Sequence, residues 1–368
     1  MSNPEKNERM KIPGLVFTHD GLPGYQRRKA GRGFRYLCPK GLVLRDQKER
    51  KRINSLAVPP AYKQVWICMM PNGHLQATGL DARGRKQYRY HEKWHEHSAQ
   101  MKFAELPGFT RELPKIRRKV KAELDREGCD RTRLVAGVVA LLDRTGLRIG
   151  NHRYAKENRS FGLVSLLSRH VQESESGWTL RFRGKSGQQN CAEIHDARIE
   201  ALIDDLQDLP GQYLFCYKQG RRWKPIESTD VNRWLKEASG ADFTAKQFRT
   251  WRATMLCARE LARCPRPETQ AEARRAELAA LRSTAAVLNH TAAVCRKYYV
   301  HPNILAAYRS GELQRQMQKR APRPVKADGS AGLRADERRV LAIIEKPIGK
   351  KGREPRVKQA SPRAPAMA

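Results

Sequence analysis

Arginine, lysine, histidine and tyrosine occur in short, distinctive contexts between residues 148 and 299. Arg148 lies in a Leu-Arg-Ile-Gly segment directly after a long apolar run, and Lys185 lies in a Gly-Lys-Ser-Gly segment. Arg249 lies in Lys-Gln-Phe-Arg, while His290 precedes Tyr299 by nine positions. Two fixed cations, a titratable lysine, a histidine and a phenol are residue types that bind and react with anions, so these five form the candidate site.

Such residues supply the parts that are needed to break a phosphodiester bond without a metal ion. A tyrosine oxygen can attack phosphorus and hold it as a covalent intermediate. The planar fork of arginine donates two parallel hydrogen bonds to the non-bridging oxygens, and histidine can add another donor. A lysine whose pKa is lowered can protonate the departing oxygen. Because the tyrosyl link keeps the energy of the original bond, resealing requires no ATP.

The sequence motifs of several other types of hydrolytic and nucleotide-binding site are missing from the chain. The chain has no His-Glu-x-x-His, no Gly-x-Ser-x-Gly and no dense acidic cluster of the kind that a two-metal nuclease requires. The Gly-Lys-Ser segment is similar to the end of a P-loop, but Thr179 stands where the first glycine of that motif is needed. We therefore expect no ATP site and no required metal, with divalent ions at most stimulatory.

Each candidate residue also has a purely structural interpretation. In so basic a chain a single arginine usually positions a phosphate or forms an ion pair. A buried histidine or tyrosine usually packs with its polar atom hydrogen bonded, and a lysine between glycines is usually a solvated turn residue. Only the order and the contexts of the five residues together favour the catalytic interpretation.

Local patterns predict the elements that position these residues. The nearly all-apolar run Val135–Leu142 predicts a buried helix in front of Arg148. Two β-like runs, 178–183 and 188–194, flank the glycines around Lys185 and predict a hairpin with the lysine at its tip. The Ala- and Leu-rich run 268–288 predicts a helix before His290.

A further helix is expected between the hairpin and Arg249. Ser228 or Thr229 can cap its first turn. Its apolar residues recur with helical spacing on one face, and Gly240 is expected to end it. The members of that face are Val231, Trp234, Leu235 and Ala238.

The chain divides into three regions of different composition. Residues 1–105 contain short β-like runs with Gly and Pro punctuation, such as Val65–Met69, the Pro-Asn-Gly turn and His74–Thr78. Residues 106–318 are mainly helical apart from the hairpin. Residues 319–368 are rich in Lys, Arg, Pro and Ala, which predicts a solvated basic tail, with one apolar patch, 340–344, compatible with a transient helix.

Charge identifies the class of partner. Lys and Arg number 73 and Asp and Glu number 38, which gives a net charge of +35. So strong a positive field attracts polyanions, and nucleic acid is the expected partner. The first residues are polar with no apolar signal region, and no stretch approaches the roughly 20 apolar residues of a membrane span. The eight cysteines are scattered without a Cys-x-x-Cys pair, so we expect a cytoplasmic, membrane-free protein without disulfides or a zinc site.

Long N-terminal motifs give the chain a family resemblance over roughly residues 14–317. The segments that carry it are Ala30–Tyr36, Val58–Tyr62, Val65–Cys68, Pro71–Gly79 and Asp81–His91. With them, the chain resembles the bacterial, poxvirus-like branch of the type IB DNA topoisomerases. The resemblance implies an α+β fold: a small β-rich N-terminal DNA clamp (1–105), a mainly helical catalytic domain (106–318) of the kind shared with tyrosine recombinases and containing a β-hairpin, and a disordered basic tail (319–368).

The resemblance also implies roles for individual residues. Tyr299 would be the nucleophile, Arg148 and Arg249 the catalytic arginines, Lys185 the general acid, and His290 the oxyanion donor. Contacts to DNA are implied for Arg85, Gln87, Tyr88, Tyr90, Arg153, Tyr154 and Lys246.

The implied activity is relaxation of supercoiled duplex DNA through a 3′-phosphotyrosyl intermediate, without ATP or a required metal. A monomer bound to duplex DNA at the nucleoid is the expected working form. Tyr298 is the alternative nucleophile because it replaces the serine that is frequent at this position of the family. The step from His290 and the following Val-His-Pro favour Tyr299.

Two other functions compete with this interpretation. A tyrosine recombinase would use the same logic of Arg, Lys, His and Tyr. It usually has His-x-x-Arg at the second arginine, where this chain has Lys246 before Arg249, and its N-terminal domain is helical. A non-enzymatic basic DNA-binding protein would account for the charge, but it leaves the order of the five candidate residues unexplained.

Overall fold

The computed structural model describes residues 12–321, except 176, 208, 210 and 211, together with 323 and 332–346. The polar start predicted for the first residues and most of the basic tail, 347–368, lie outside the described residues. The chain divides into two compact units, Met1–Ala104 and Glu105–Ala368. Within the described part, no helix is long and apolar enough to cross a membrane.

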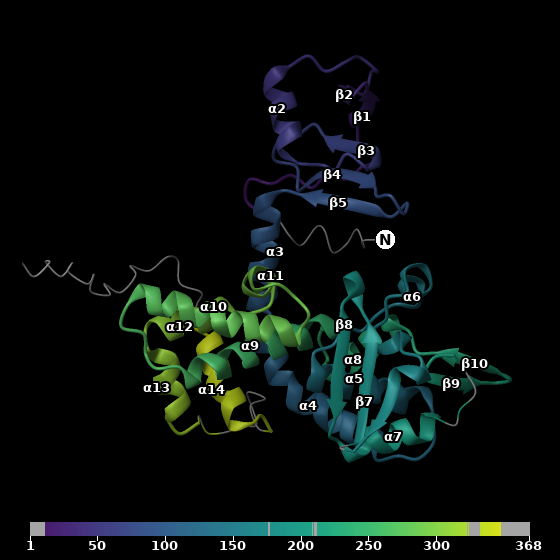
Figure 1. Cartoon of the computed structure of the whole chain (residues 1–368), viewed down its shortest axis with the longest axis vertical. Coiled ribbons are helices and arrows are strands. Elements are labelled where there is room, and N and C mark those ends of the chain that lie inside the picture. The colour runs from purple at the N-terminus through teal and green to yellow at the C-terminus, as the bar shows by residue number, and fades with distance from the viewer. Residues whose placement is uncertain are drawn as a thin grey trace, which may run out of the picture. The chain divides into compact units, whose positions relative to one another are not determined.

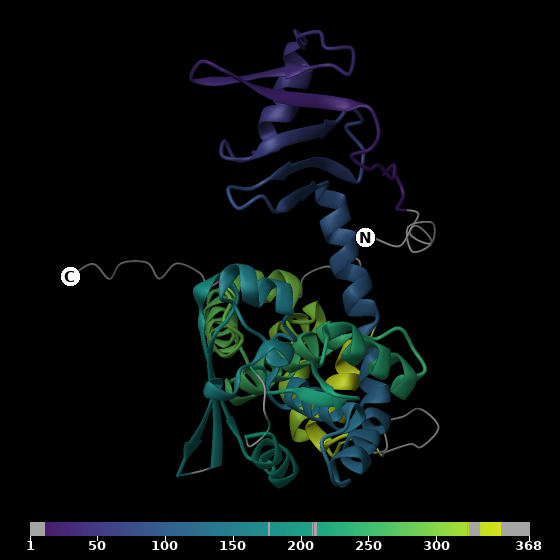
Figure 2. The same ribbon diagram turned by 90° about the vertical axis from the view of Figure 1, so that its right-hand side faces the viewer.

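The first unit is built on a five-stranded antiparallel sheet with the strand order β2-β1-β3-β4-β5 (Figure 1). Helix α2 lies against one face of this sheet (Figure 2). The predicted strand, turn and strand at 65–78 is confirmed by the antiparallel pairing of β3 with β4. The elements are β1 (Gly24–Ala30), β2 (Gly33–Leu37), α2 (Gln47–Ser55), β3 (Lys63–Cys68), β4 (Leu75–Leu80), β5 (Lys86–Tyr90) and α3 (Glu92–Ala104).

Strand register gives this sheet two different faces. Tyr25 pairs with Ile67, which pairs with Ala77, and these side chains form a small core with Ile53 of α2. Cross-strand partners share a face because side chains alternate along a strand. The residues that alternate with them, such as Trp66, Thr78 and Tyr88, are cross-strand partners and therefore lie on the opposite face, away from α2.

The second unit is mainly helical, as the sequence predicts, and carries a three-stranded antiparallel sheet, β6-β7-β8, beside its helices (Figure 1). Its helices are α4 (Leu106–Leu124), α5 (Arg131–Thr145), α6 (His152–Asn158), α7 (Ala197–Gln207), α8 (Ser228–Ser239), α9 (Ala245–Arg263), α10 (Gln270–Val287), α11 (Ala292–Tyr298), α12 (Pro302–Arg309), α13 (Glu312–Gln318) and α14 (Ala335–Ile344). Its strands and 3-10 turns are η1 (Leu163–Ser165), η2 (Ser168–His170), β6 (Val171–Ser174), β7 (Gly177–Arg183), η3 (Lys185–Gly187), β8 (Gln189–Ile194), β9 (Cys216–Gln219) and β10 (Arg222–Pro225).

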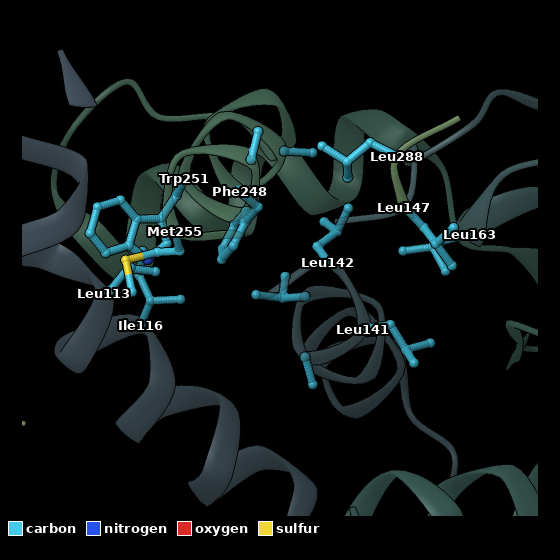
Figure 3. Close-up of a cluster of buried hydrophobic side chains, with 14 of the residues drawn as sticks. Leu113, Ile116, Leu141, Leu142, Leu147, Leu163, Phe248, Trp251, Met255 and Leu288 are labelled. Carbon is cyan, nitrogen blue, oxygen red and sulfur yellow. The ribbon is translucent and has the colours of Figure 1, made fainter. Parts of the chain in front are cut away.

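Helix α5 is the centre of the core of this unit. Every residue from Leu134 to Leu142 is buried, which confirms the predicted buried helix. Leu141 and Leu142 of α5 share this core with Phe248, Trp251 and Met255 of α9, and Met255 lies beside Leu113 and Ile116 of α4 (Figure 3). Burial on all sides fixes α5 firmly, so the chain leaves it toward Arg148 from a rigid base.

The predicted helix boundaries differ from the structure at one cap. Helix α8 begins after Glu227, whose backbone N–H is bonded by Asp230, so neither Ser228 nor Thr229 is the N-cap. Asp230 satisfies an otherwise unbonded donor with a charged acceptor, which removes the need for a hydroxyl at that position. Gly240 does end the helix, in the left-handed conformation with φ of 76°.

The predicted solvated tail differs from the structure at α14. Apolar side chains of this helix and its approach are buried against the second unit: Leu333, Val340, Leu341, Ile343 and Ile344. The carboxylate of Glu337 is paired with Arg117 of α4 at 2.8 Å, and Arg117 also pairs with Asp143 of α5 at 2.7 Å. The basic composition of the region conceals a short amphipathic helix whose apolar face completes the core.

Truncation at the two ends of α14 should therefore have different effects. Ending the chain after Gln318 removes five buried apolar side chains, each contributing about 1.5–3 kcal/mol when fully buried. We expect the free energy of unfolding in urea to fall on the order of several kcal/mol. Ending the chain after Lys346 keeps α14 and should leave that free energy unchanged. Equal stability of the two truncated proteins would contradict the packing role of α14.

The ion pair of Glu337 should make stability depend on acid pH. Burial alone would raise the pKa of Glu337, but its hydrogen bonds and charge interaction with Arg117 lower it to about 2. Its ordinary pKa is 4.5. The pair therefore stabilises the fold above pH 4.5, and this contribution disappears as pH falls toward 2. The unfolding free energies of wild type and Glu337→Gln should differ near neutral pH and converge in acid; a pH-independent difference would refute this coupling.

Candidate active site

The loop that carries Arg148 is shaped by the close approach of two glycines, Gly150 and Gly162. Helix α5 ends at Gly146 in the left-handed conformation, and Arg148 follows, half-buried. Its backbone carbonyl accepts a hydrogen bond of 3.0 Å from Leu163. Gly150 has φ of 84°, and a Cβ there would lie 2.8 Å from the Cα of Gly162. A side chain at either glycine would force the two backbone segments apart, so the path after Arg148 depends on this close approach.

Arg249 is a buried guanidinium that joins two other segments. It lies in the second turn of α9, whose first turn is capped by Thr244, and only 6% of the residue is exposed. Its Nη1 donates to the carbonyl of Gly146 at 2.6 Å, and its Nη2 donates to the carbonyl of Leu288. Burial, and then the charge of Arg148, lowers the pKa of Arg249 to about 10. The arginine still carries its positive charge at neutral pH.

His290 and Tyr299 complete the cluster. Their rings are stacked with centroids 4.4 Å apart and an interplanar angle of 22°. Nη2 of Arg249 lies 2.9 Å from Nε2 of His290, and Nη2 of Arg148 lies 3.4 Å from Nδ1 of the same ring. The guanidinium carbon of Arg249 is 5.5 Å from the centroid of the Tyr299 ring. Four of the five candidate residues are therefore brought together.

Electrostatics make this cluster receptive to an anion. Burial lowers the pKa of Arg148 as well as that of Arg249. Among the described residues, no carboxylate forms an ion pair with either guanidinium. Two desolvated cations beside a histidine produce a concentrated positive field, which a phosphodiester could neutralise. Among the residues that the structure describes, there is no group of three or more His, Cys, Asp or Glu side chains that could hold a metal ion.

The two adjacent tyrosines have different surroundings. Tyr299 is the C-cap of α11, and its ring stacks on His290. Tyr298 lies in the last turn of α11, and the ammonium group of Lys297 is 5.5 Å from its ring centroid. The contacts with the cluster described above belong to Tyr299.

Two residues that hold this cluster were missed by the sequence analysis. The hydroxyl of Thr254, on α9, donates to the carbonyl of Thr250 at 2.8 Å, lies 3.3 Å from the carbonyl oxygen of Tyr299 and accepts from the N–H of His301 at 3.2 Å. Asn289 has φ of 50°, and its side chain donates to the carbonyl of Gln189 at 2.9 Å. Neither contact has a sequence signal beyond the tolerance of Asn for this conformation, since the partners are distant in the chain.

Lys185 is placed at the predicted hairpin tip but outside the cluster. It begins the 3-10 turn between β7 and β8, and its side chain is exposed. Within the described residues, this side chain forms no hydrogen bond or ion pair. Asn289, next to His290, ties the start of β8 to the cluster. The hairpin is thus anchored near the site while its lysine remains accessible.

The predicted DNA contacts of the second unit are exposed. Tyr154 is 54% exposed on α6, whose N-cap is Asn151. Arg153, on the same helix, is held by Glu157 at 2.7 Å, one turn away. Lys246 is exposed in the first turn of α9.

The predicted contacts of the first unit lie on or beside β5. Tyr88 and Tyr90 are stacked with centroids 6.1 Å apart, and Tyr88 is 49% exposed. Arg85 pairs with Asp81 at 2.7 Å, and Gln87 also donates to Asp81, at 3.0 Å. The hydrogen bond from Arg85 is the main reason that the pKa of Asp81 is lowered to about 2.

Comparisons with known proteins agree with this geometry. The family described as "Eukaryotic DNA topoisomerase I, catalytic core" matches residues 91–323, and "Bacterial DNA topoisomerase IB, N-terminal domain" matches residues 33–81. A DNA topoisomerase 1B of Acanthamoeba polyphaga mimivirus is 32% identical over 298 residues, which cover 78% of this chain and 88% of the viral protein. A DNA topoisomerase 1B of Vaccinia virus (strain Copenhagen) is 25% identical over 190 residues, 46% of this chain and 58% of that protein. On its fold, its clustered residues and these relatives, the chain belongs to the type IB DNA topoisomerases.

Proposed function

We propose that this topoisomerase relaxes supercoiled duplex DNA by cutting one strand through a 3′-phosphotyrosyl link on Tyr299 and then resealing it. The observation that carries the proposal is the convergence of Arg148, Arg249 and His290 on that tyrosine. Neither ATP nor a metal ion is required, because the covalent link preserves the bond energy and the cations are supplied by the protein. The enzyme acts as a monomer on DNA in the cytoplasm.

Cleavage begins when the phenolic oxygen of Tyr299 attacks phosphorus. The bond between phosphorus and O5′ breaks as the new bond forms, and the phenolic proton passes to solvent. Arg148 and Arg249 donate to the non-bridging oxygens, where negative charge increases, and His290 adds a further donor. The downstream duplex can then rotate, and attack by the 5′-hydroxyl reverses each step.

Lys185 supplies the proton that the departing O5′ requires. Its exposed position at the hairpin tip lets it enter a groove of bound DNA, while the bond from Asn289 to Gln189, just after the turn, keeps it near the cluster. Transfer from a lysine becomes easier near other cations, because their charge lowers the pKa of its ammonium group. Arg148 can relay the proton to the oxygen.

Phosphate and base contacts hold the duplex during this reaction. We assign them to Tyr154, Arg153 and Lys246 in the second unit, and to the β5 tyrosines with Arg85 and Gln87 in the first. The net charge of +35 adds sequence-independent attraction that weakens with salt.

Removing each tyrosine hydroxyl in turn identifies the nucleophile. Tyr299→Phe should abolish relaxation of a negatively supercoiled plasmid in EDTA without ATP, because the attacking oxygen is lost. Tyr298→Phe is the matched control and should retain relaxation. Gel mobility shift should show that both variants still bind duplex DNA. Relaxation by Tyr299→Phe but not by Tyr298→Phe would transfer the nucleophile to Tyr298, and a strict metal requirement would contradict the mechanism. Relaxation of a plasmid of arbitrary sequence would also exclude a recombinase, because a recombinase needs paired specific sites.

A substrate that needs no proton donor tests the role of Lys185. Lys185→Ala should slow single-turnover cleavage of an ordinary duplex, and a substrate with sulfur in place of the bridging O5′ should restore the rate. A thiolate leaves without protonation, so the donor is then dispensable. Arg249→Ala is the control: it should be slower on the order of 100- to 1,000-fold on both substrates, because it stabilises phosphate oxygens. Failure of sulfur to rescue Lys185→Ala would remove the lysine from the acid role.

A further inference from the structure

A buried carboxylate lies beneath the segment that carries Tyr299. Glu277 is in the middle of α10, and none of its surface is exposed. Its neighbours along the helix, Ala273, Ala280 and Leu281, are buried as well. An acidic side chain in such a position loses its hydration and persists only when cations and hydrogen bonds replace the water.

The cations that replace the water around Glu277 are two arginines, one before Tyr299 in the sequence and one after it. Arg296, in the last turn of α11, donates to Glu277 at 2.6 Å. Arg309, at the end of α12, donates twice to the same carboxylate, at 2.6 and 2.9 Å. One carboxylate therefore holds the helix that precedes Tyr299 and the helix that follows it, and both its oxygens are engaged.

This clamp acts together with a backbone anchor. Thr254 accepts a hydrogen bond from the N–H of His301 and lies against the carbonyl of Tyr299, and so ties the turn between α11 and α12 to α9. Helix α9 also carries Arg249. Thr254 fixes the turn against the arginine helix, and Glu277 fixes the two helices that flank the turn against α10, which leads to His290.

We propose that Glu277 is a positioning residue for the nucleophile: through Arg296 and Arg309 it sets where the Tyr299 oxygen lies relative to the bound phosphate. The inference rests on the proposed role of Tyr299. Glu277 touches neither DNA nor the reacting atoms in this scheme. A small displacement of a nucleophile, on the order of 1 Å, can slow a reaction about 100-fold, so loss of the clamp should affect the rate of chemistry.

The experiment compares single-turnover cleavage at saturating enzyme with DNA binding. Glu277→Gln keeps the size of the side chain and removes its charge. We expect cleavage about 10- to 100-fold slower than in wild type, with an unchanged Kd for duplex DNA. Religation should slow by the same factor, because a misplaced nucleophile raises the barrier in both directions and leaves the cleavage equilibrium unaltered. Glu277→Asp, which keeps the charge, should recover part of the rate.

A stability-matched control separates positioning from a general loss of folding. Glu337→Gln removes another fully buried carboxylate paired with an arginine, on α14 rather than beside Tyr299. Both variants are assayed below their Tm, and only Glu277→Gln should be slow. If Glu277→Gln is too unstable to assay, Arg296→Met with Arg309→Met and Glu277→Leu removes every charge of the clamp and should still show slow cleavage.

The substrate with sulfur in place of the bridging O5′ gives a second test. Sulfur at the bridging position should not restore cleavage by Glu277→Gln, because the defect lies in the attacking group. Rescue by sulfur, or equal slowing of Glu277→Gln and Glu337→Gln, would overturn the positioning role. Normal cleavage by Glu277→Gln beside an inactive Tyr299→Phe would overturn this inference alone, whereas activity of Tyr299→Phe would overturn the proposed function itself.

Discussion

The active site depends on the placement of a charged guanidinium in the interior of the second unit. Arg249 is almost fully buried, and its charge is compensated by the carbonyls of Gly146 and Leu288 rather than by a carboxylate. Those carbonyls belong to the ends of α5 and α10, from which the Arg148 loop and His290 continue. Satisfying one buried donor group thus brings three catalytic segments together. A carboxylate partner would have neutralised the charge that a phosphate needs.

The sequence predicted well those features that depend on local pattern. The buried helix before Arg148, the hairpin around Lys185 and the end of α8 at Gly240 each follow from hydrophobic period or glycine conformation. The convergence of Arg148, Arg249, His290 and Tyr299 was predicted only through their order and the resemblance to a family. Spacing along the chain does not by itself give distances in space.

Other features could not be predicted because they are contacts between distant segments. Thr254 and Asn289 hold the site through bonds to backbone groups far away in the sequence. Helix α14 was concealed by the basic composition of its surroundings, and it lies beyond residue 323, where the family match ends. Its apolar face becomes evident only when the core that it completes is known. Glu277 has the same character, since a glutamate in an Ala-rich helix ordinarily faces solvent.

The position of Arg148 depends on a contact between uncharged backbone segments. Gly150 and Gly162 set the loop by close backbone approach, whereas Glu277 and Arg296 set the tyrosine segment by ionic attraction. Van der Waals contact is not screened by mobile ions, whereas the exposed side of the Arg296 guanidinium leaves the ionic contact open to some screening. The two segments of the active site therefore respond differently to the medium: ionic strength acts on the contact that holds the tyrosine segment, and the backbone contact that holds the Arg148 loop does not change with it.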